Sequence, residues 1–283
     1  QLTDAVRGAP LTVSSSGSFA ENNNAERLKS FDADGFTLGN DIAVNQSGQT
    51  YAAWNWEANG AGVSNTDGSI TSTVSVGATS QQNWFSVVSW TGTGANATVG
   101  HGLGVTPSLI INKPRTIVDN WISWAEPLGS TGYIYLNLEN ASTTGASVWN
   151  STLPTADVFS VGTSSNANPN GGGMISYCFA NAEGLCKAGS YVGNGSSDGP
   201  MIFTGHRPSF LLIKRTGSSG PWLLWDNKRT GYNGDNDALR PNSNATEYNG
   251  STYRWVDLLS NGFKIIDNSV DFNNNGETFI YLS

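Results

Sequence analysis

Hydrophobic positions along the chain fall in short runs that polar turn residues interrupt. Glycine, asparagine, serine and proline cluster between the runs, and helical periodicity never persists over the length of an ordinary helix. The runs are rich in β-branched and aromatic residues, and they include residues 85–90, 108–112, 133–136, 158–161 and 174–179. This pattern predicts an all-β protein built from antiparallel β-sandwiches of the jelly-roll kind.

Two parts of the chain share a pattern at a spacing of 101 positions. The shared features are a Pro-Ser pair before a strand, a lysine at the end of that strand and a Trp-x-x-Trp pair: residues 107–111 with 208–212, Lys113 with Lys214, and Trp121 and Trp124 with Trp222 and Trp225. Two tryptophan pairs in the same phase predict tandem repeats of about 100 residues.

The second half of this repeat occurs three times. A strand with a phenylalanine, a glycine turn and another apolar run follow one another in residues 34–54, 157–177 and 261–281. Residues 3–7 align with residues 225–229, so the front strands of the first repeat are missing. The predicted domains are the C-terminal half of a truncated first repeat (1–60), a linker (61–84), a second repeat (85–184) and a third repeat (185–283). Alternation in residues 69–76 predicts an extra strand within the linker.

A sandwich without its front strands leaves an apolar face and unpaired strand edges. We expect the missing strands to lie on an upstream part of a longer polypeptide or to come from a neighbouring subunit.

Composition and charge narrow the range of partners. The net charge is −8 and Lys and Arg never form a run, so we expect no nucleic-acid partner. The longest apolar runs have the length of a strand, so we expect no membrane insertion. Hydrophobic residues make up 37% of the chain and ten residues are tryptophan, which is enough to form packed cores.

Motifs typical of enzymes are missing from the sequence. It has no G-x-S-x-G, P-loop or H-E-x-x-H pattern, and its two histidines, His101 and His206, do not share a repeat phase. Acidic residues scatter without a repeated pair for glycoside hydrolysis. We therefore expect a protein that is not an enzyme.

One loop resembles the start of a calcium site. Asp271, Asn273 and Asn275 precede Gly276 as in the D-x-[DN]-x-[DN]-G opening of an EF-hand loop, but the twelfth position is Leu282 instead of Glu. A glycine turn before a strand also explains the pattern. We interpret it as a turn, with calcium as the alternative, and we predict no other cofactor.

Cys178 and Cys186 are the only cysteines. They are either bonded to each other or free, with Cys178 a small residue inside a strand. The pattern does not decide between these two states.

The tryptophan pairs are the candidate ligand-binding residues. Residues i and i+3 of a strand point to opposite faces, so one tryptophan of each pair belongs to the core and the other lies at a rim or stacks on sugar rings. The alternative is that both are core residues with a bend between them. The candidates for glycan binding are Trp121, Trp124, Trp222 and Trp225.

Several longer motifs resemble a repeated β domain found in virion proteins of marine and cyanobacterial tailed phages, many of them tail-fibre-like. The matching segments are residues 31–39, 49–56, 100–107 and 175–180. The resemblance implies a fibre or appendage on a virus particle, oligomeric, in contact with other virion proteins and with the host surface. It implies no functional residue.

Three hypotheses about function follow. The first is a virion fibre that attaches to host-surface glycans, where linked weak sites gain avidity. The second is a head-decorating or filament-forming subunit that binds no glycan. The third is a glycan-degrading enzyme, which the scattered acidic residues disfavour.

Overall fold

The computed structural model describes residues 1–283 except residues 79–81, 230–232, 235 and 249–254. Every pair of strands in it is antiparallel, and the helices among the described residues are single turns. These helices are α1 (Ile42–Asn45), the 3-10 turn η1 (Glu126–Leu128), α2 (Ala146–Trp149) and α3 (Val270–Asn273). The predicted all-β class is confirmed.

The largest sheet has eight strands in the order β12-β11-β10-β9-β14-β7-β6-β5. Their bounds are β5 (Val63–Asn65), β6 (Ser72–Ala78), β7 (Asn83–Thr91), β9 (Leu109–Pro114), β10 (Ile122–Ala125), β11 (Gly132–Tyr135), β12 (Thr143–Thr144) and β14 (Gly173–Phe179). A two-stranded sheet of β8 (Ala97–Gly100) and β13 (Val158–Val161) packs on it. We call residues 63–179 the middle module.

A four-stranded sheet has the order β15-β21-β17-β18, made by β15 (Ala188–Val192), β17 (Phe210–Arg215), β18 (Trp222–Asp226) and β21 (Thr278–Leu282). It packs on a three-stranded sheet of β16 (Met201–Phe203), β20 (Gly262–Ile265) and β19 (Val256–Leu259). We call residues 188–282 the C-terminal module. Its sheet order matches the β7-β14-β9-β10 part of the large sheet, strand for strand in chain order.

The N-terminal module, residues 1–58, contains two small hairpins. These are β1 (Leu11–Thr12) with β2 (Asn22–Asn23), and β3 (Leu28–Phe31) with β4 (Phe36–Leu38). Residues 49–56, which align with the strand β21, belong to no sheet in the structure. The reason is that the N-terminal module has no counterparts of β15 and β17, between which β21 pairs.

The predicted extra strand corresponds to β6, which pairs with β7, while β5 extends the sheet further. Both strands lie in the segment predicted as a linker. The division of the chain into tandem repeats stays a prediction.

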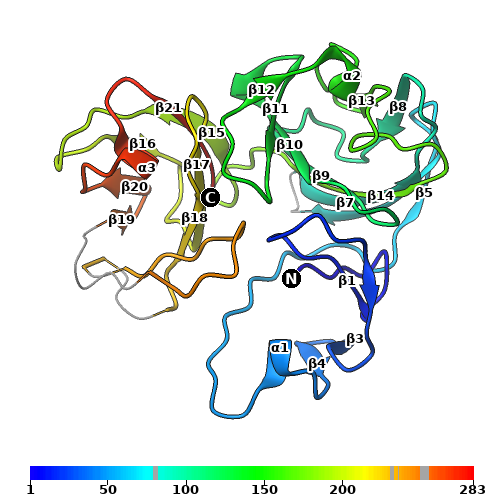
Figure 1. The fold of residues 1–283 in the computed structure, drawn as a ribbon, viewed down its shortest axis with the longest axis horizontal. Helices are drawn as coiled ribbons and strands as arrows, with labels where there is room; N and C mark the ends of the chain where they lie inside the picture. Colours follow the sequence, from blue (N-terminus) through cyan, green and yellow to red (C-terminus); the bar gives the residue numbers. More distant parts are fainter. Residues whose placement is uncertain (79–81, 230–232, 235, 249–254) are drawn as a thin grey trace.

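The three modules lie beside one another (Figure 1), and a shared core of buried side chains joins them. This core is formed by one face of the eight-stranded sheet, one face of the four-stranded sheet and residues of the N-terminal module. Its buried members include Val13, Phe85, Ile111, Trp121, Ile175, Leu212, Trp222 and Ile280. The central strands of each large sheet are therefore buried on both faces, which explains their unbroken apolar runs.

Both cysteines are free and buried, Cys178 within β14. Burial raises the pKa of each thiol to about 12, so both are protonated and poorly nucleophilic at neutral pH. None of the helices among the described residues is long and apolar enough to cross a membrane.

Candidate functional site

All four candidate tryptophans are buried in the protein interior. Trp121 and Trp222 belong to the shared core, whereas Trp124 and Trp225 belong to the cores inside the middle and C-terminal modules. The two members of a pair thus point to opposite faces, as a strand requires.

Both faces are buried because neighbouring modules cover the second face of each sheet. Both tryptophans of each pair are therefore core residues, as in the alternative, but they lie on opposite faces of the sheet and no bend is needed to bury both. None of the four offers an indole face on which a sugar could stack, since each is at most 2% exposed.

The indole N–H groups hold the modules together. Trp121 Nε1 donates to the carbonyl of Ser14 at 2.8 Å, and Trp222 Nε1 donates to the carbonyl of Tyr135 at 2.8 Å. Each bond links a β-sheet to the module that precedes it in the chain. These tryptophans are positioned for assembly of the modules.

The loop that resembles a calcium site forms a turn. Gly276 has φ 75°, a left-handed conformation that favours glycine, and it leads into β21. Asp271 lies 3.6 Å from Arg215 Nη1, and Asn273 is buried with its side-chain oxygen accepting from the Asn194 N–H at 2.9 Å. Two of the predicted ligands thus face other partners, and no group of three or more His, Cys, Asp or Glu gathers among the described residues.

Asn273 instead forms hydrogen bonds that fix the neighbouring loop after β15. Its amide donates to the carbonyls of Ser196 at 2.7 Å and Asp267 at 2.8 Å. In the middle module, Asn168 makes the matching bonds: its amide donates to the carbonyls of Ala95 at 2.6 Å and Gly162 at 3.0 Å, and its oxygen accepts from the Thr93 N–H at 2.7 Å.

Sequence analysis missed this role of the two asparagines. The signal was present, because Asn45, Asn168 and Asn273 each precede the aligned glycine by three residues.

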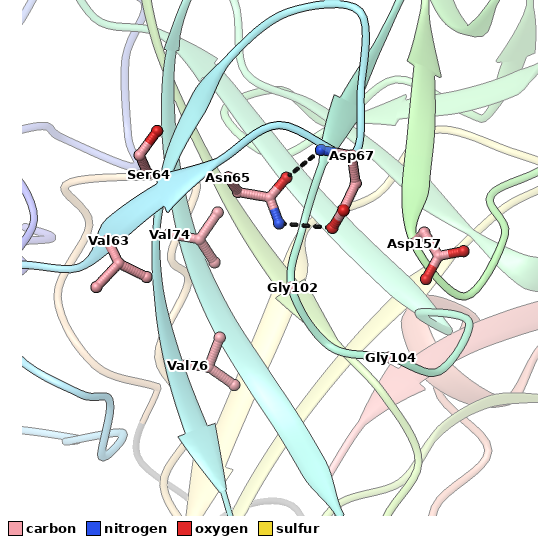
Figure 2. Close-up of a pocket in the computed structure, with 9 residues that line it drawn as sticks. All are labelled: Val63, Ser64, Asn65, Asp67, Val74, Val76, Gly102, Gly104 and Asp157. Atoms are coloured by element: carbon pink, nitrogen blue, oxygen red, sulfur yellow. Dashed lines mark hydrogen bonds between the residues drawn. The ribbon is translucent and has the colours of Figure 1, made fainter.

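A pocket of about 340 Å³ opens between the β5–β6 hairpin and the loop after β8 (Figure 2). Asn65 and Asp67 lie on one side and Asp157 on the opposite side, with Val63, Val74 and Val76 along β5 and β6. Asn65 Nδ2 donates to Asp67 Oδ2 at 2.7 Å, which orients both side chains. Two carboxylates and an amide beside apolar side chains are groups that bind hydroxylated or cationic ligands.

His101 is buried just beyond this pocket. Its Nδ1 accepts from the Leu103 N–H at 3.3 Å, so its Nε2, 3.2 Å from the carbonyl of Thr155, carries the proton. Burial lowers the pKa of His101, which favours the neutral ring. The imidazole therefore has a structural role in shaping the loop.

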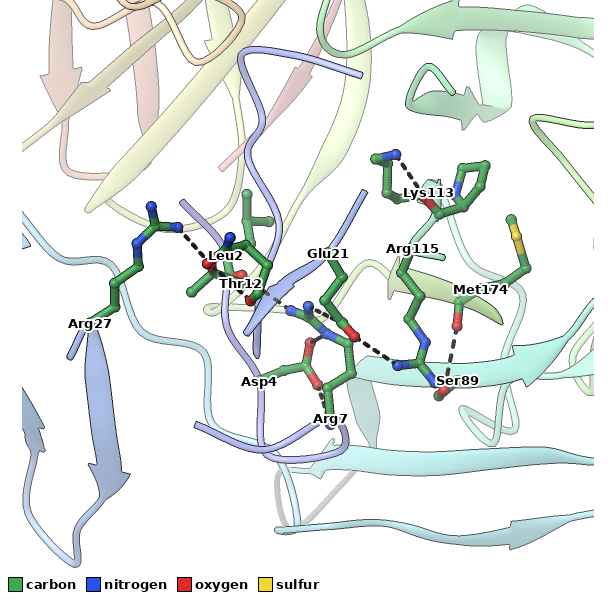
Figure 3. Close-up of polar contacts among 12 residues, drawn as sticks. Leu2, Asp4, Arg7, Thr12, Glu21, Arg27, Ser89, Lys113, Arg115 and Met174 are labelled. Carbon is green, nitrogen blue, oxygen red and sulfur yellow. Dashed lines mark hydrogen bonds and ion pairs between the residues drawn. The ribbon is translucent and has the colours of Figure 1, made fainter. Parts of the chain in front are cut away.

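A network of ion pairs and hydrogen bonds, buried around Arg7 and partly exposed at Arg115, joins the N-terminal and middle modules (Figure 3). Arg7 Nε lies 2.6 Å from Asp4 Oδ2, and Arg7 Nη1 lies 2.9 Å from Glu21 Oε2. Arg115 Nη1 lies 3.1 Å from the other oxygen of Glu21, and the Tyr177 hydroxyl donates to Asp4 Oδ2 at 2.9 Å. Each charge is matched, as a buried network needs, so this cluster serves as a junction between modules.

No curated protein and no solved structure matches the chain. One family pattern matches over residues 1–283, and its description is "domain of unknown function (DUF7483)". Because the match covers the whole sequence, the chain belongs to the DUF7483 family.

Proposed function

We propose that the protein is a structural component of a virus particle, a fibre or appendage built from tandem β-sandwich repeats of the jelly-roll kind. The observation that carries this proposal is a junction that occurs twice with the same contacts. The lysines at the ends of β9 and β17 reach the preceding module in the same way as the tryptophans: Lys113 Nζ donates to the carbonyl of Ser18 at 3.3 Å, and Lys214 Nζ donates to the carbonyl of Glu139 at 3.0 Å.

The backbone repeats this junction. The Asp119 N–H donates to the carbonyl of Ser18 at 3.0 Å, and the Gly220 N–H donates to the carbonyl of Glu139 at 2.8 Å. Lys113 and Lys214 are completely buried, so each ammonium is committed to these carbonyls. A junction that repeats with the same contacts holds the short modules rigidly together, and we infer that this rigid unit is a building block of a fibre or appendage.

Phage origin is supported by the resemblance of residues 31–39, 49–56, 100–107 and 175–180 to tail-fibre-like virion proteins. Under this proposal the protein lies on the particle surface, forms an oligomer and contacts other virion proteins. The described cores and junctions serve assembly, and we propose no catalytic role for them. A head-decorating or filament-forming subunit is the alternative within the same structural class.

Attachment to a host glycan is the second candidate function, and the pocket beside β5 favours it. Its carboxylates and amide can form hydrogen bonds with sugar hydroxyls, and its valines can pack against the apolar face of a sugar ring. The pocket depends on β5 and β6. The described part of the C-terminal module pairs no strand on the corresponding edge of β15.

Electron microscopy of particles labelled with an antibody against this chain tests the proposal. Label on tail-associated fibres is the expected result. Label spread over the head, or on filaments without virus, would favour the alternative subunit. Absence of the chain from purified particles would overturn the virion role.

A glycan screen tests attachment separately. We expect binding by the wild-type protein and about a tenfold weaker affinity for Asp157→Asn and Asp67→Asn, since each removes a charged acceptor from the pocket. Asp34→Asn, in the exposed β3–β4 turn, is the matched control and should bind as the wild type does. Equal binding by all four proteins would exclude the pocket.

A further inference from the structure

The N-terminal module exposes an apolar face that its C-terminal counterpart buries. Register defines the correspondence, because Phe31 pairs with Phe36 across β3 and β4 as Leu258 pairs with Phe263 across β19 and β20. Phe31 is 45% and Phe36 38% exposed, whereas Leu258 is 1% and Phe263 0% exposed. We call Phe31, Phe36 and Tyr51 the open face.

Tyr51 aligns with a buried residue as well. It occupies the place of Phe279 in β21, yet it is 51% exposed while Phe279 is 0% exposed. Figure 1 shows β3, β4 and α1 extending away from the other modules. Large apolar side chains that are exposed on paired strands, as Phe31 and Phe36 are, are typical of a binding surface.

The C-terminal module shows what covers such a face. Leu258, Phe263 and Phe279 pack in one core with residues of β17 and β18, which are Leu211, Ile213, Leu223 and Trp225. The covering strands β15, β17 and β18 lie in one continuous segment, residues 188–226.

Asn45, next to the open face, lacks the second loop to which its counterpart Asn273 is hydrogen-bonded. The amide of Asn45 donates to the carbonyl of Gly39 at 2.8 Å, six residues back, as the amide of Asn273 does to the carbonyl of Asp267. Asn273 also holds the loop at Asn194 and Ser196 after β15, whereas Asn45 is exposed. A loop like 193–196 would complete the bonds of Asn45.

Residues 2–7 have the same contacts as residues 224–229, which form and follow the C-terminal end of the covering strand β18. The backbone N–H and carbonyl of Leu2 form hydrogen bonds with those of Val13, at 2.8 and 3.0 Å. Leu224 and Leu239 form the same two hydrogen bonds, both at 2.9 Å. Asp4 then binds Arg7 as Asp226 binds Arg229. Leu2 therefore continues the line of a strand equivalent to β18.

The C-terminal module has backbone carbonyls equivalent to those that accept the tryptophan and lysine bonds at the two junctions. The tryptophan and lysine junctions use the carbonyls of Ser14 and Ser18 after Val13, and those of Tyr135 and Glu139 after Ile134. The equivalent carbonyls after Leu239 belong to Arg240 and Asn244. Within the described residues, no indole or ammonium group donates to either of them.

The modules already contact one another in a closed cycle. Trp54 Nε1 donates to Asp226 Oδ2 at 3.2 Å, which links the N-terminal module to the C-terminal one. This bond matches the one from Tyr177 to Asp4 between the middle and N-terminal modules. A covering segment on the open face would thus lie next to the segment 240–244.

We propose that the open face binds a polypeptide segment of the same kind as residues 188–226, with counterparts of β15, β16, β17 and β18, entering in line with Leu2. Its tryptophan, at the place of Trp222, donates to the carbonyl of Arg240, and its lysine, at the place of Lys214, donates to the carbonyl of Asn244. Residues 50–54 become its central strand partner, in the role of β21. This inference goes beyond the proposed function and holds whether or not the protein is part of a virion.

Hydrogen exchange on a fusion protein tests the inference. A second copy of residues 188–222 is joined directly to Gln1, so that the copied strand runs into Leu2. We expect the amides of residues 50–54 to exchange about 100-fold more slowly than in the wild-type protein, because they enter a sheet. The matched control carries Leu211→Asp and Ile213→Asp in the copy only, and its amides should exchange at the wild-type rate.

Exchange as fast in the fusion as in the control would overturn the proposal. So would slow exchange of residues 50–54 in the wild-type chain together with a concentration-dependent dimer in sedimentation, because a second copy would then cover the face. If the fusion does not fold, a synthetic peptide of residues 188–226 added to the wild-type chain gives the same readout. Protection of residues 50–54 supports the proposal, and no protection at saturating peptide contradicts it.

Discussion

The hairpin β3–β4 and the hairpin β19–β20 are built from the same hydrophobic pattern but have opposite environments. Phe36 and Phe263 occupy the same register position, one at the surface and one fully buried. Local sequence sets the hairpin and its alternation, while burial depends on whether a second sheet lies over it. The difference teaches that a segment with this pattern can form its hairpin without covering strands.

The largest expected effect comes from the paired phenylalanines. Phe263→Ala leaves a cavity in a packed core and should lower the free energy of unfolding by about 3–5 kcal/mol, whereas Phe36→Ala should cost less than about 1 kcal/mol. Urea denaturation of both variants measures the two costs. Equal costs would mean that the open face is covered in solution.

Lys214 belongs to the covering strands that the N-terminal module lacks. Burial and the positive charge of Arg215 lower the pKa of Lys214 to about 8 from 10.5. The unfolded chain therefore holds more protons between pH 8 and 10.5, so this lysine makes stability rise with pH across that window and adds no slope below it.

A pKa change of this size corresponds to about 3 kcal/mol over the window. The measurement is the difference in free energy of unfolding between the wild type and Lys214→Met from pH 7.5 to 10.5. Lys264→Met, at a partly exposed lysine paired with Asp198, is the control. A wild-type minus Lys214→Met difference that stays flat with pH would contradict a depressed lysine pKa.

Replacing the equivalent asparagines Asn273 and Asn45 should give the smallest difference in unfolding free energy between the two regions. Asn273→Ala removes a buried side chain that satisfies backbone groups of two loops, and we expect a loss of about 2 kcal/mol. Asn45→Ala removes one exposed bond and should cost about 0.5 kcal/mol or less. Thermal unfolding followed by circular dichroism compares the two, and in the fusion protein with a copied segment 188–222 the cost of Asn45→Ala should rise toward that of Asn273→Ala.

Much of the local structure could be predicted from alternation and turn residues. The run 158–161 is strand β13, and the runs 85–90 and 174–179 lie within β7 and β14. The spacing of 101 residues placed Lys113 and Lys214, and each tryptophan pair, at equivalent positions of matching strands. These features are local or periodic, so the sequence is sufficient for them.

The candidate site was harder to predict. For the tryptophan pairs the sequence left two interpretations open, one indole at a rim or on a sugar, or both indoles in the core. A strand's period of two says which residues share a face but not what covers that face. The pocket beside Asp157 brings together residues far apart in the chain, and no local pattern marks it. The calcium-like loop shows the same limit, since no local pattern marks the hydrogen bonds of Asn273 to the loop at Asn194 and Ser196.

The sequence by itself determined the all-β class, the positions of many of the longer strands, and the pairs of equivalent residues. Tertiary structure alone decided that both faces of the large sheets are buried, that Lys113 and Lys214 tie one module to the next, and that Phe36 is exposed where Phe263 is not. The physical reason is that strand formation depends on neighbouring residues along the chain. Burial depends on surfaces that distant segments bring together.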